Sequence, residues 1–358
     1  MKAVVYTGDK KIAVEDRQKP TILEPTDAVI RILYTTICGT DLHILEGHVP
    51  SCTPGRILSH EGVGIIDSLG VAVTNFTVGQ TVLVSCITSC GTCGYCRIKM
   101  PSQCESGGWV LGNKIDGTQA EYARIPHALF SLHALPQSID PKLAVTLSDT
   151  VPTAYECGIL NGRIQPGSAI VIIGAGPIGL MILQMAKNLF GPAVTVVVGR
   201  GQPRLETARS MGADHTLSVL QGQEAAISSA LAVTEERGFN VVIDAVGTAG
   251  SFETAQALVG PGGTIASLGV FRESCELHLE KLWDQNICLR TRLVDAVSTP
   301  HLIKLVELGS VDPHFLVSHS DYSFRDVSDA YEAFEASSRH GTLKIIITSS
   351  EPTTDGSA

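Results

Sequence analysis

The chain has 358 residues, which is more than one ordinary hydrophobic core covers and suits two domains. Hydrophobic residues make up 44% and charged residues 17%, a balance typical of a globular protein rather than a disordered one. The net charge of −10 argues against a nucleic-acid-binding protein, which needs a basic face, and gives no reason to expect binding to an anionic membrane.

The first part of the chain, residues 1–150, consists of short β-branched runs separated by Gly, Pro and Asp, which predicts a mostly β domain. Charges interrupt the N-terminal sequence every few residues, so no signal peptide is expected. The longest apolar run, around Ile170–Ile173, is too short to span a bilayer. We therefore expect a cytoplasmic protein whose 10 cysteines are thiols or metal ligands rather than disulfides.

Three separate stretches of this part carry residues that could bind a catalytic zinc ion. They contain Cys38, the pair His60 and Glu61, and Asp149. A catalytic zinc needs about three protein ligands of mixed type and one open position. The spacing alone does not bring these residues together, however, and a buried cysteine or a hydrogen-bonded core histidine is common without any metal. From the residues alone, both interpretations stay open.

Four further cysteines are packed into one short segment with the pattern C-x2-C-x2-C-x7-C: Cys90, Cys93, Cys96 and Cys104. Four thiolates can surround one tetrahedral ion and leave no open position, as in a structural zinc site. Disulfides are disfavoured by a reducing compartment and by the tight spacing. A nucleic-acid-binding zinc ribbon is disfavoured by the acidic charge balance.

From residue 151 to residue 296 the pattern changes to alternating strands and helices, which predicts a parallel sheet covered on both faces. The strand AIVII runs directly into a G-x-G-x-x-G turn and then into an apolar helix. A glycine-rich turn of another kind is the alternative, but these flanks favour dinucleotide binding, with the pyrophosphate at the helix N-terminus. The candidate cofactor-binding residues of the turn are Gly174, Gly176, Pro177, Ile178 and Gly179.

The next strand, VTVVV, ends where an NAD enzyme places an acidic residue on the adenosine ribose. Here the chain reads Gly199 followed by Arg200, with Arg204 further on. No acid would repel a 2′-phosphate, and Arg200 could bind one with two hydrogen bonds. We therefore expect NADP(H) to be preferred over NAD(H). The alternative is that Arg200 is a solvated loop residue and the protein has no preference.

The last part, residues 297–358, contains two helical segments and a final strand, TLKIIIT. Lys344 in that strand is expected to be either a surface lysine or a contact to a cofactor phosphate. The C-terminal SSEPTTDGSA is polar and is expected to form a flexible tail.

Together these motifs resemble those of the zinc-containing medium-chain alcohol dehydrogenases, along essentially the whole chain. The resemblance rests on Cys38-Gly39-Thr40-Asp41-x-His43, His60-Glu61-x2-Gly64-x5-Gly70-x2-Val73, the four-cysteine segment and the Gly174–Gly179 turn. It implies an α/β fold with a GroES-like β catalytic domain over residues 1–150. A Rossmann domain with a doubly wound parallel sheet would follow over 151–296, and residues 297–358 would return to the catalytic domain.

The resemblance also implies roles for individual residues. Cys38, His60 and Asp149 look like the ligands of the catalytic zinc. Glu61 resembles the family acid that approaches the metal and can exchange with water or substrate.

Among the candidate catalytic residues, Thr40 would hydrogen-bond the substrate oxygen, and His43 would complete a proton relay to solvent. A turn threonine and a surface histidine are the plainer interpretations of these two residues.

Further positions would complete the cofactor and substrate sites. Thr153 resembles the residue that packs against the nicotinamide, and Gly269 and Val270 are expected to bind its carboxamide. Trp109 and Leu293 are expected to line the substrate pocket.

Several features are similar to the secondary-alcohol dehydrogenase branch of the family: Asp149 as third ligand, Gly108-Trp109, and Gly199-Arg200. The best-known NADP-dependent members of that branch lack a four-cysteine segment, however, so the substrate is not settled by analogy. Two positions depart from the family pattern. Ser59 replaces the glycine before the His-Glu pair, which could alter the turn that presents His60, and Gln80 replaces the aspartate after Gly79.

The expected activity is hydride transfer between NADP(H) and a small, secondary alcohol or ketone, by a homo-oligomer (dimer or tetramer). The chain would hold two zinc ions, one catalytic and one structural. One alternative is a polyol or amino-alcohol dehydrogenase that uses NAD. Another is a catalytically inactive nucleotide-binding sensor, against which the intact ligand set argues.

Overall fold

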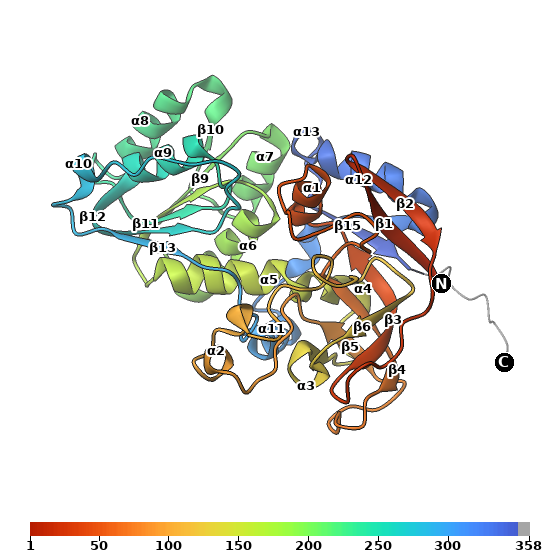
Figure 1. Cartoon of the computed structure of the whole chain (residues 1–358). Helices are drawn as coiled ribbons and strands as arrows, with labels where there is room; N and C mark the ends of the chain where they lie inside the picture. The colour runs from red at the N-terminus through yellow and green to blue at the C-terminus, as the bar shows by residue number, and fades with distance from the viewer. Residues whose placement is uncertain (350–358) are drawn as a thin grey trace.

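The computed structural model describes residues 1–349, apart from the side chains of residues 319–321. The expected tail begins at Ser349, but Ser349 is buried and its N–H donates to the carbonyl of Leu33 at 3.1 Å, so this residue belongs to the folded part. The rest of the expected tail, residues 350–358, lies outside the described part. Two large β-sheets lie side by side, with the helices packed around and between them (Figure 1). Within residues 1–349, no helix combines the length and the apolar character needed to cross a bilayer.

The first large sheet has six parallel strands in the order β10-β9-β8-β11-β12-β13. Successive strands are added to one side of β8 and then to the other, which is the arrangement of doubly wound nucleotide-binding sheets. The parallel sheet confirms the predicted α/β class. Its strands are β8 (Ala169–Ile173), β9 (Val194–Gly199), β10 (His215–Ser218), β11 (Phe239–Asp244), β12 (Val259–Ser267) and β13 (Cys288–Thr291).

The apolar run of β8 forms a central strand because both of its faces are covered. Ile170 and Ile172 belong to one hydrophobic core with α6, whereas Val171 and Ile173 belong to a second core with α8 and α9. Side chains alternate between the faces of a strand, so an uninterrupted apolar run can fill two cores. The helical segments of this region are α6 (Pro177–Met185), η4 (Ala186–Phe190), α7 (Gln202–Ser210), η5 (Val219–Gln221), α8 (Gln223–Val233), α9 (Ala249–Leu258) and α10 (Leu279–Leu282).

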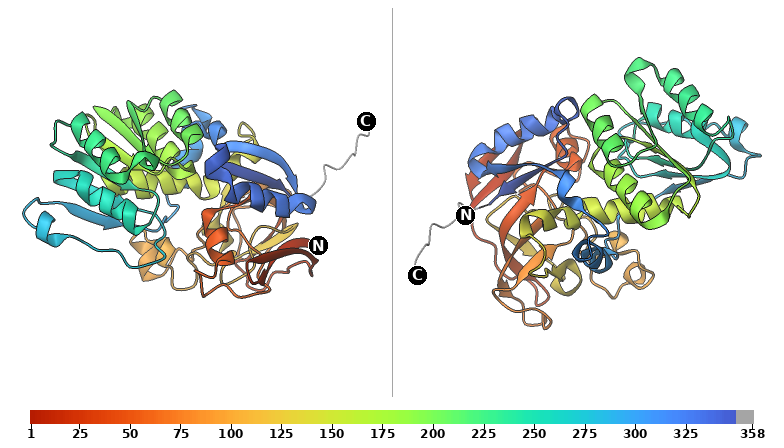
Figure 2. Two further views of the ribbon diagram at one scale, coloured as in Figure 1. Left: turned by 90° about the horizontal axis from the view of Figure 1, so that it is seen from above. Right: turned by 180° about the vertical axis from the view of Figure 1, so that it is seen from behind.

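The second large sheet has seven strands and joins the two ends of the chain. Its order is β14-β15-β3-β4-β5-β7, with β6 paired to β3, and Figure 2 shows the C-terminal segments in blue against the N-terminal strands in red. The strands are β3 (Ala28–Thr36), β4 (Gly62–Leu69), β5 (Thr81–Val84), β6 (Tyr122–Ile125), β7 (Leu132–Ala134), β14 (Val317–Ser323) and β15 (Lys344–Thr348). A separate antiparallel pair is formed by β1 (Lys2–Gly8) and β2 (Lys11–Asp16).

The pairing of β15 with β3 determines where Lys344 lies. The two strands are antiparallel, with Ile346 opposite Thr36, so β15 begins where β3 ends. Since β3 leads into Cys38, the pairing brings Lys344 close to Cys38 although the two residues are far apart in sequence.

Short helices connect the two sheets, and one hydrophobic core runs through them. This core includes Val63 of β4, Val151 of α5 and Ile170 of β8. The remaining helical segments are α1 (Gly39–Leu45), α2 (Gly94–Arg97), η1 (Pro101–Gln103), α3 (Ala128–Ser131), α4 (Pro141–Ala144), η2 (Val145–Ser148), α5 (Thr150–Thr153), η3 (Ala154–Leu160), α11 (Thr299–Glu307), η6 (Pro313–Leu316), η7 (Phe324–Asp326), α12 (Val327–Glu335) and α13 (Ser337–His340).

The turn from β8 into α6 needs glycine at two positions for steric reasons. Gly174 has a φ of +111°, and a Cβ there would lie 2.9 Å from Cγ2 of Val246. A Cβ on Gly179 would lie only 1.9 Å from the carbonyl oxygen of Gly174. Gly176, in contrast, has no atom within 4 Å of such a Cβ. Gly179 therefore serves packing, whereas Gly176 leaves open space above the turn.

This difference predicts that two alanine variants lose unequal amounts of unfolding free energy. Gly179→Ala should lower the free energy of unfolding by about 2 kcal/mol or more, because α6 must move away from the turn. Gly176→Ala, the matched control, has room for its Cβ and should lower it by only about 0.5–1 kcal/mol, the loss of a favourable N-cap residue. Thermal or urea unfolding of both proteins measures this. Equal losses in the two variants would contradict the packing described for Gly179.

Candidate active site

Three segments distant in sequence bring Cys38, His60 and Asp149 together. Cys38 caps the N-terminus of α1, His60 lies just before β4, and Asp149 lies just before α5. Nε2 of His60 lies 3.4 Å from Oδ2 of Asp149, and Sγ of Cys38 lies 3.8 Å from the same oxygen. One donor atom of each residue, together with one of Glu61, lies within 4.8 Å of the others. This mixed set of sulfur, nitrogen and oxygen donors fits zinc.

Asp41 holds two of these segments in place, a role that the sequence analysis did not assign. Its Oδ2 accepts a hydrogen bond of 2.8 Å from the backbone N–H of Cys38, and its Oδ1 accepts one of 3.1 Å from that of Ser59. The carboxyl is fully buried. Asp41 therefore fixes Cys38 relative to the turn that presents His60. Its place in the Cys38–His43 motif was the available signal.

The departure from the family pattern at Ser59 is accommodated by the backbone. Ser59 has a φ of +68°, in the left-handed region that favours glycine. Its hydroxyl donates to the carbonyl of Thr36 at 3.1 Å and accepts from the N–H of Glu61 at 3.2 Å. These two bonds hold the turn in the conformation that a glycine would adopt more easily.

Lys344 is not a surface residue. It is 3% exposed, and its Nζ donates to Oε1 of Glu61 at 2.5 Å. The other oxygen of Glu61, Oε2, is buried and has no hydrogen-bond partner among the described residues. A buried carboxylate oxygen without a partner is costly. Since Glu61 belongs to the same cluster as Cys38, His60 and Asp149, this oxygen fits a nearby cation.

The charges of the cluster shift its protonation equilibria. Burial raises the pKa of Glu61 to about 7, against the lowering effect of the Lys344 ammonium. Burial also acts on Asp149, but the hydrogen bond and charge of His60 outweigh it and lower the pKa of Asp149. Asp149 is therefore ionised at neutral pH, the form that ligates a metal.

Thr153 orients Asp149. The Thr153 hydroxyl donates to Oδ1 of Asp149 at 2.6 Å, which leaves Oδ2 for Cys38 and His60. Residues that hydrogen-bond a metal ligand in this way set its orientation. This contact is additional to the nicotinamide contact expected from the sequence.

Thr40 and His43 lie on α1 beside the cluster. Oγ1 of Thr40 is 3.6 Å from Sγ of Cys38. His43 lies almost one turn further along the helix, and its buried Nδ1 has no hydrogen-bond partner among the described residues. His43 is not part of the four-residue cluster; it belongs to a separate group with Glu46 and His48.

Trp109 packs beside the cluster. Its ring meets the ring of His60 edge to face, with 6.1 Å between the centroids. It also packs against a small apolar group that includes Cys86, Cys157 and Val294. Leu293, also expected in the pocket, is 45% exposed and is not part of this group.

The four cysteines Cys90, Cys93, Cys96 and Cys104 form a second compact cluster. Two Sγ–Sγ distances, Cys90 to Cys96 and Cys93 to Cys104, are 3.9 Å. The edge of a tetrahedron with Zn–S bonds of about 2.3 Å is about 3.8 Å. All ten cysteines of the chain are free of disulfides. The cluster therefore fits a closed thiolate site for zinc.

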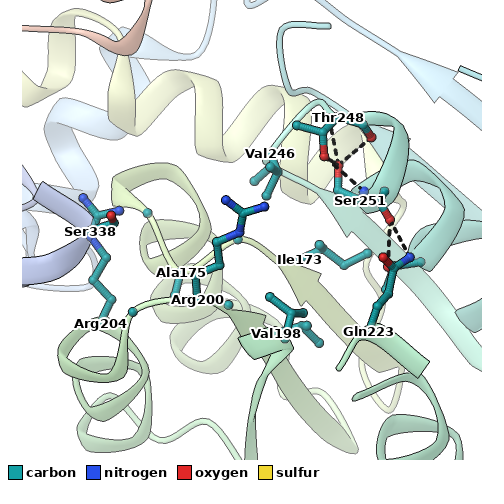
Figure 3. Close-up of a pocket in the computed structure, with 18 residues that line it drawn as sticks. Ile173, Ala175, Val198, Arg200, Arg204, Gln223, Val246, Thr248, Ser251 and Ser338 are labelled. Carbon is teal, nitrogen blue, oxygen red and sulfur yellow. Dashed lines mark hydrogen bonds between the residues drawn. The ribbon is translucent and has the colours of Figure 1, made fainter. Parts of the chain in front are cut away.

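A cavity of about 420 Å³ lies next to the turn between β8 and α6, within the size range of small-ligand sites. Gly174, Gly176 and Gly199 line it, whereas Pro177, Ile178 and Gly179 form the first turn of α6 behind it. Figure 3 shows the side chain of Arg200 reaching over this hollow, with Arg204 beside Ser338.

The two arginines of the cavity differ in their partners. Arg200 is exposed and forms none of the ion pairs found within residues 1–349. Arg204 donates through Nη2 to the carbonyl of Thr342 at 2.6 Å, so part of its hydrogen-bonding capacity is already used. None of the described residues that line the cavity is acidic. Its electrostatic character therefore suits an anion.

Gly269, Val270 and Leu293 line a different hollow, beside the four-cysteine segment. Gly269 packs closely on Gly247: a Cβ added to Gly269 would lie 2.2 Å from the backbone nitrogen of Gly247. The structure thus groups these three residues together, apart from the cavity near Gly174.

Comparisons with known proteins agree with this geometry. Residues 24–137 match the description "Alcohol dehydrogenase GroES-like domain", and residues 177–307 match "Zinc-binding dehydrogenase". An alcohol dehydrogenase from Cupriavidus necator is 34% identical over 372 aligned positions, which cover 97% of this chain and 98% of that protein.

Solved structures are also similar over nearly the whole chain. The apo form of zinc-dependent alcohol dehydrogenase 2 from a streptococcus is 41% identical, with a TM-score of 0.93 and coverage of 98% of this chain and 100% of that one. An alcohol dehydrogenase from Escherichia coli CFT073, solved with NADH, is 27% identical, with a TM-score of 0.87 and coverage of 98% and 99%.

The matches confirm the GroES-like and Rossmann-type parts of the predicted fold, and they support an oxidoreductase that uses zinc and a nicotinamide cofactor. The secondary-alcohol branch is not specifically supported. On the combined evidence of motifs, fold and relatives, the chain belongs to the zinc-dependent medium-chain alcohol dehydrogenase family.

Proposed function

We propose that the protein is a zinc-dependent dehydrogenase that transfers a hydride between NADP(H) and a small secondary alcohol or its ketone. The observation that carries this proposal is the convergence of Cys38, His60 and Asp149 from three distant segments onto one small volume. Buried His60 and Asp149 beside the half-buried Cys38 are hard to explain by packing alone, because such polar groups are costly without a cation or proton to share.

When bound, zinc would supply a Lewis acid that acidifies the alcohol hydroxyl, and the nicotinamide would supply the hydride acceptor. Thr40 would accept the hydrogen bond of the substrate hydroxyl at Oγ1. His43 would receive the proton on a ring nitrogen and release it to solvent, a task that suits its ordinary pKa near neutrality. Burial and the charge of Arg272 lower this pKa in the structure, so His43 is neutral at neutral pH and readily passes a received proton on to solvent.

Glu61 and Lys344 would balance the charge of the centre. The Lys344 ammonium holds one oxygen of Glu61, while the other oxygen is buried and has no hydrogen-bond partner within residues 1–349. This supports a role for Glu61 as an alternative oxygen donor, with Lys344 controlling how far Glu61 reaches.

The apolar surroundings support a simple alcohol rather than a polyol. Trp109, Cys86, Cys157 and Val294 form an apolar wall beside His60. A polyol or amino alcohol would need additional polar partners there. Leu293 would contribute only at the outer edge of the pocket.

The cofactor preference rests on Arg200. Its guanidinium is exposed just after β9 and forms no ion pair within residues 1–349, and none of the described residues that line the cavity is acidic; both features favour a 2′-phosphate. Gly174 and Gly176 would hold the pyrophosphate at the start of α6, whereas Gly269 and Val270 would bind the carboxamide.

The proposal includes the organisation of the whole protein. Residues 1–150 and 297–358 would form the catalytic domain, and 151–296 the cofactor domain. The second zinc would be held by the four-cysteine cluster. Edge strand β13 and the exposed Trp283 and Leu289 near it support a homo-oligomer, a dimer or tetramer. Free thiols throughout support a cytoplasmic location.

Metal content and activity test the catalytic centre together. The purified enzyme should contain two zinc ions per chain and consume NADPH with a ketone. Cys38→Ser should retain one zinc ion and lose activity by about a hundredfold or more. Elemental analysis and a survey of ketones, aldehydes, polyols and threonine with both nicotinamides measure this.

Cys275→Ser, which changes an exposed thiol, is the matched control and should keep both ions and full activity. A wild-type protein that holds a single ion unaffected by Cys38→Ser, with no turnover of any substrate, would point instead to a non-catalytic nucleotide-binding protein.

The cofactor preference is tested at Arg200. Arg200→Ile should raise the Michaelis constant for NADP about 10- to 100-fold and leave that for NAD nearly unchanged, since one charged contact is lost. Adding Gly199→Asp should favour NAD further, although its Cβ would lie 3.1 Å from Cβ of Ala175. Arg237→Gln, which changes an exposed arginine that does not line the cavity, is the control. An unchanged NADP constant in Arg200→Ile would show that the 2′-phosphate binds elsewhere.

A further inference from the structure

A third group of potential metal ligands lies at the C-terminal end of α1, apart from both clusters described above. It consists of His43, Glu46 and His48, each with one donor atom within 4.8 Å of the others. Nδ1 of His48 is 3.3 Å from Oε2 of Glu46. The family resemblance assigns no ligand to Glu46 or His48.

The turn that ends α1 builds this cluster. The N–H of Gly47 bonds to the carbonyl of Ile44 at 3.0 Å, and the N–H of His48 bonds to the carbonyl of His43 at 2.9 Å. Gly47 has a φ of +79°. This pair of bonds is the Schellman pattern, which folds the chain back so that the side chains of its first and last residues meet. Apolar residues usually occupy these two positions; here both are histidines, with 6.2 Å between the ring centroids.

The donor set matches the preferences of divalent transition metals. Two imidazoles and a carboxylate suit Zn²⁺ or Ni²⁺. Around a tetrahedral ion with bonds of about 2.0–2.1 Å, neighbouring donor atoms lie about 3.3 Å apart. The distance between His48 and Glu46 already has this value, and exposed side chains can turn to bring in the third donor. Nδ1 of His43 is buried and has no hydrogen-bond partner within the described chain, so it is one ring nitrogen through which His43 could coordinate the metal.

One protein cation currently occupies part of this cluster. Nη1 of Arg272 lies 2.6 Å from Oε2 of Glu46. Arg272 lies in the segment after β12, so this ion pair joins the first large sheet to α1. A metal ion at the cluster would compete with Arg272 for Glu46, and removing the guanidinium should favour the metal.

We propose that His43, Glu46 and His48 form a third metal site, for a divalent transition metal ion, whose occupancy inhibits the enzyme. An imidazole that coordinates a metal through one nitrogen can no longer receive a proton there and release another. Binding itself is independent of the proposed function; the inhibition rests on the relay role proposed for His43.

Calorimetric titration of the zinc-loaded enzyme with Ni²⁺, without cofactor, tests the binding. We expect one Ni²⁺ ion per chain to bind without release of zinc, which elemental analysis checks. His48→Gln should weaken this binding about tenfold or more, because a ligand is lost. Arg272→Gln should strengthen it. His314→Gln, which removes an exposed histidine paired to Asp312 elsewhere, is the matched control and should leave binding unchanged.

Activity assays in Ni²⁺ distinguish metal binding at this site from the proposed proton relay through His43. Wild-type activity should fall in Ni²⁺ and recover with a chelator that leaves zinc in place, whereas His48→Gln should keep its basal activity and resist Ni²⁺. Binding without inhibition would retain the site and overturn the inhibitory role, and with it the relay through His43. Ni²⁺ binding that His48→Gln does not weaken would overturn the site, whatever the activity of the enzyme.

Discussion

The structure depends on keeping several charged and polar groups buried in one small volume. Cys38, His60, Glu61 and Asp149 meet where the two sheets join, and the loss of their hydration must be offset by mutual contacts or by a cation. The ammonium of Lys344 pairs with one oxygen of Glu61, and the second oxygen has no partner in the described part of the chain. A metal ion is the simplest group that would complete this balance.

Hydrogen bonds and strand pairing in the surrounding fold fix the positions of these donors. Asp41 links the backbone of Cys38 to that of Ser59, and Thr153 fixes the carboxylate of Asp149. The pairing of β15 with β3 carries Lys344 to the same place from the far end of the chain. Since metal geometry depends on ligand orientation, these contacts matter as much as the ligands themselves. The β8–α6 turn, with its own steric requirement for glycine, lines the cavity proposed for the cofactor.

Much of the fold could be predicted from the sequence because the patterns that specify it lie within short segments. The apolar run of β8, the glycine turn and the spacing from Cys90 to Cys104 each encode their structure within a few residues. Lys344 was assigned wrongly and Asp41 was given no role, because their partners lie far away in the sequence or in the backbone. A lysine in a terminal strand gives no sign of burial until the pairing of β15 with β3 is known. The cluster at the end of α1 was missed for another reason: its histidines meet only through a left-handed turn at Gly47.

A crystal structure with anomalous diffraction measured at the zinc edge examines the central claim most directly. If Cys38, His60 and Asp149 hold a zinc ion, one anomalous peak will lie within about 2.0–2.3 Å of Sγ of Cys38, Nε2 of His60 and a carboxylate oxygen of Asp149. A second peak should lie inside the four-cysteine cluster. A fully metal-loaded protein with no peak between Cys38, His60 and Asp149 would contradict the account.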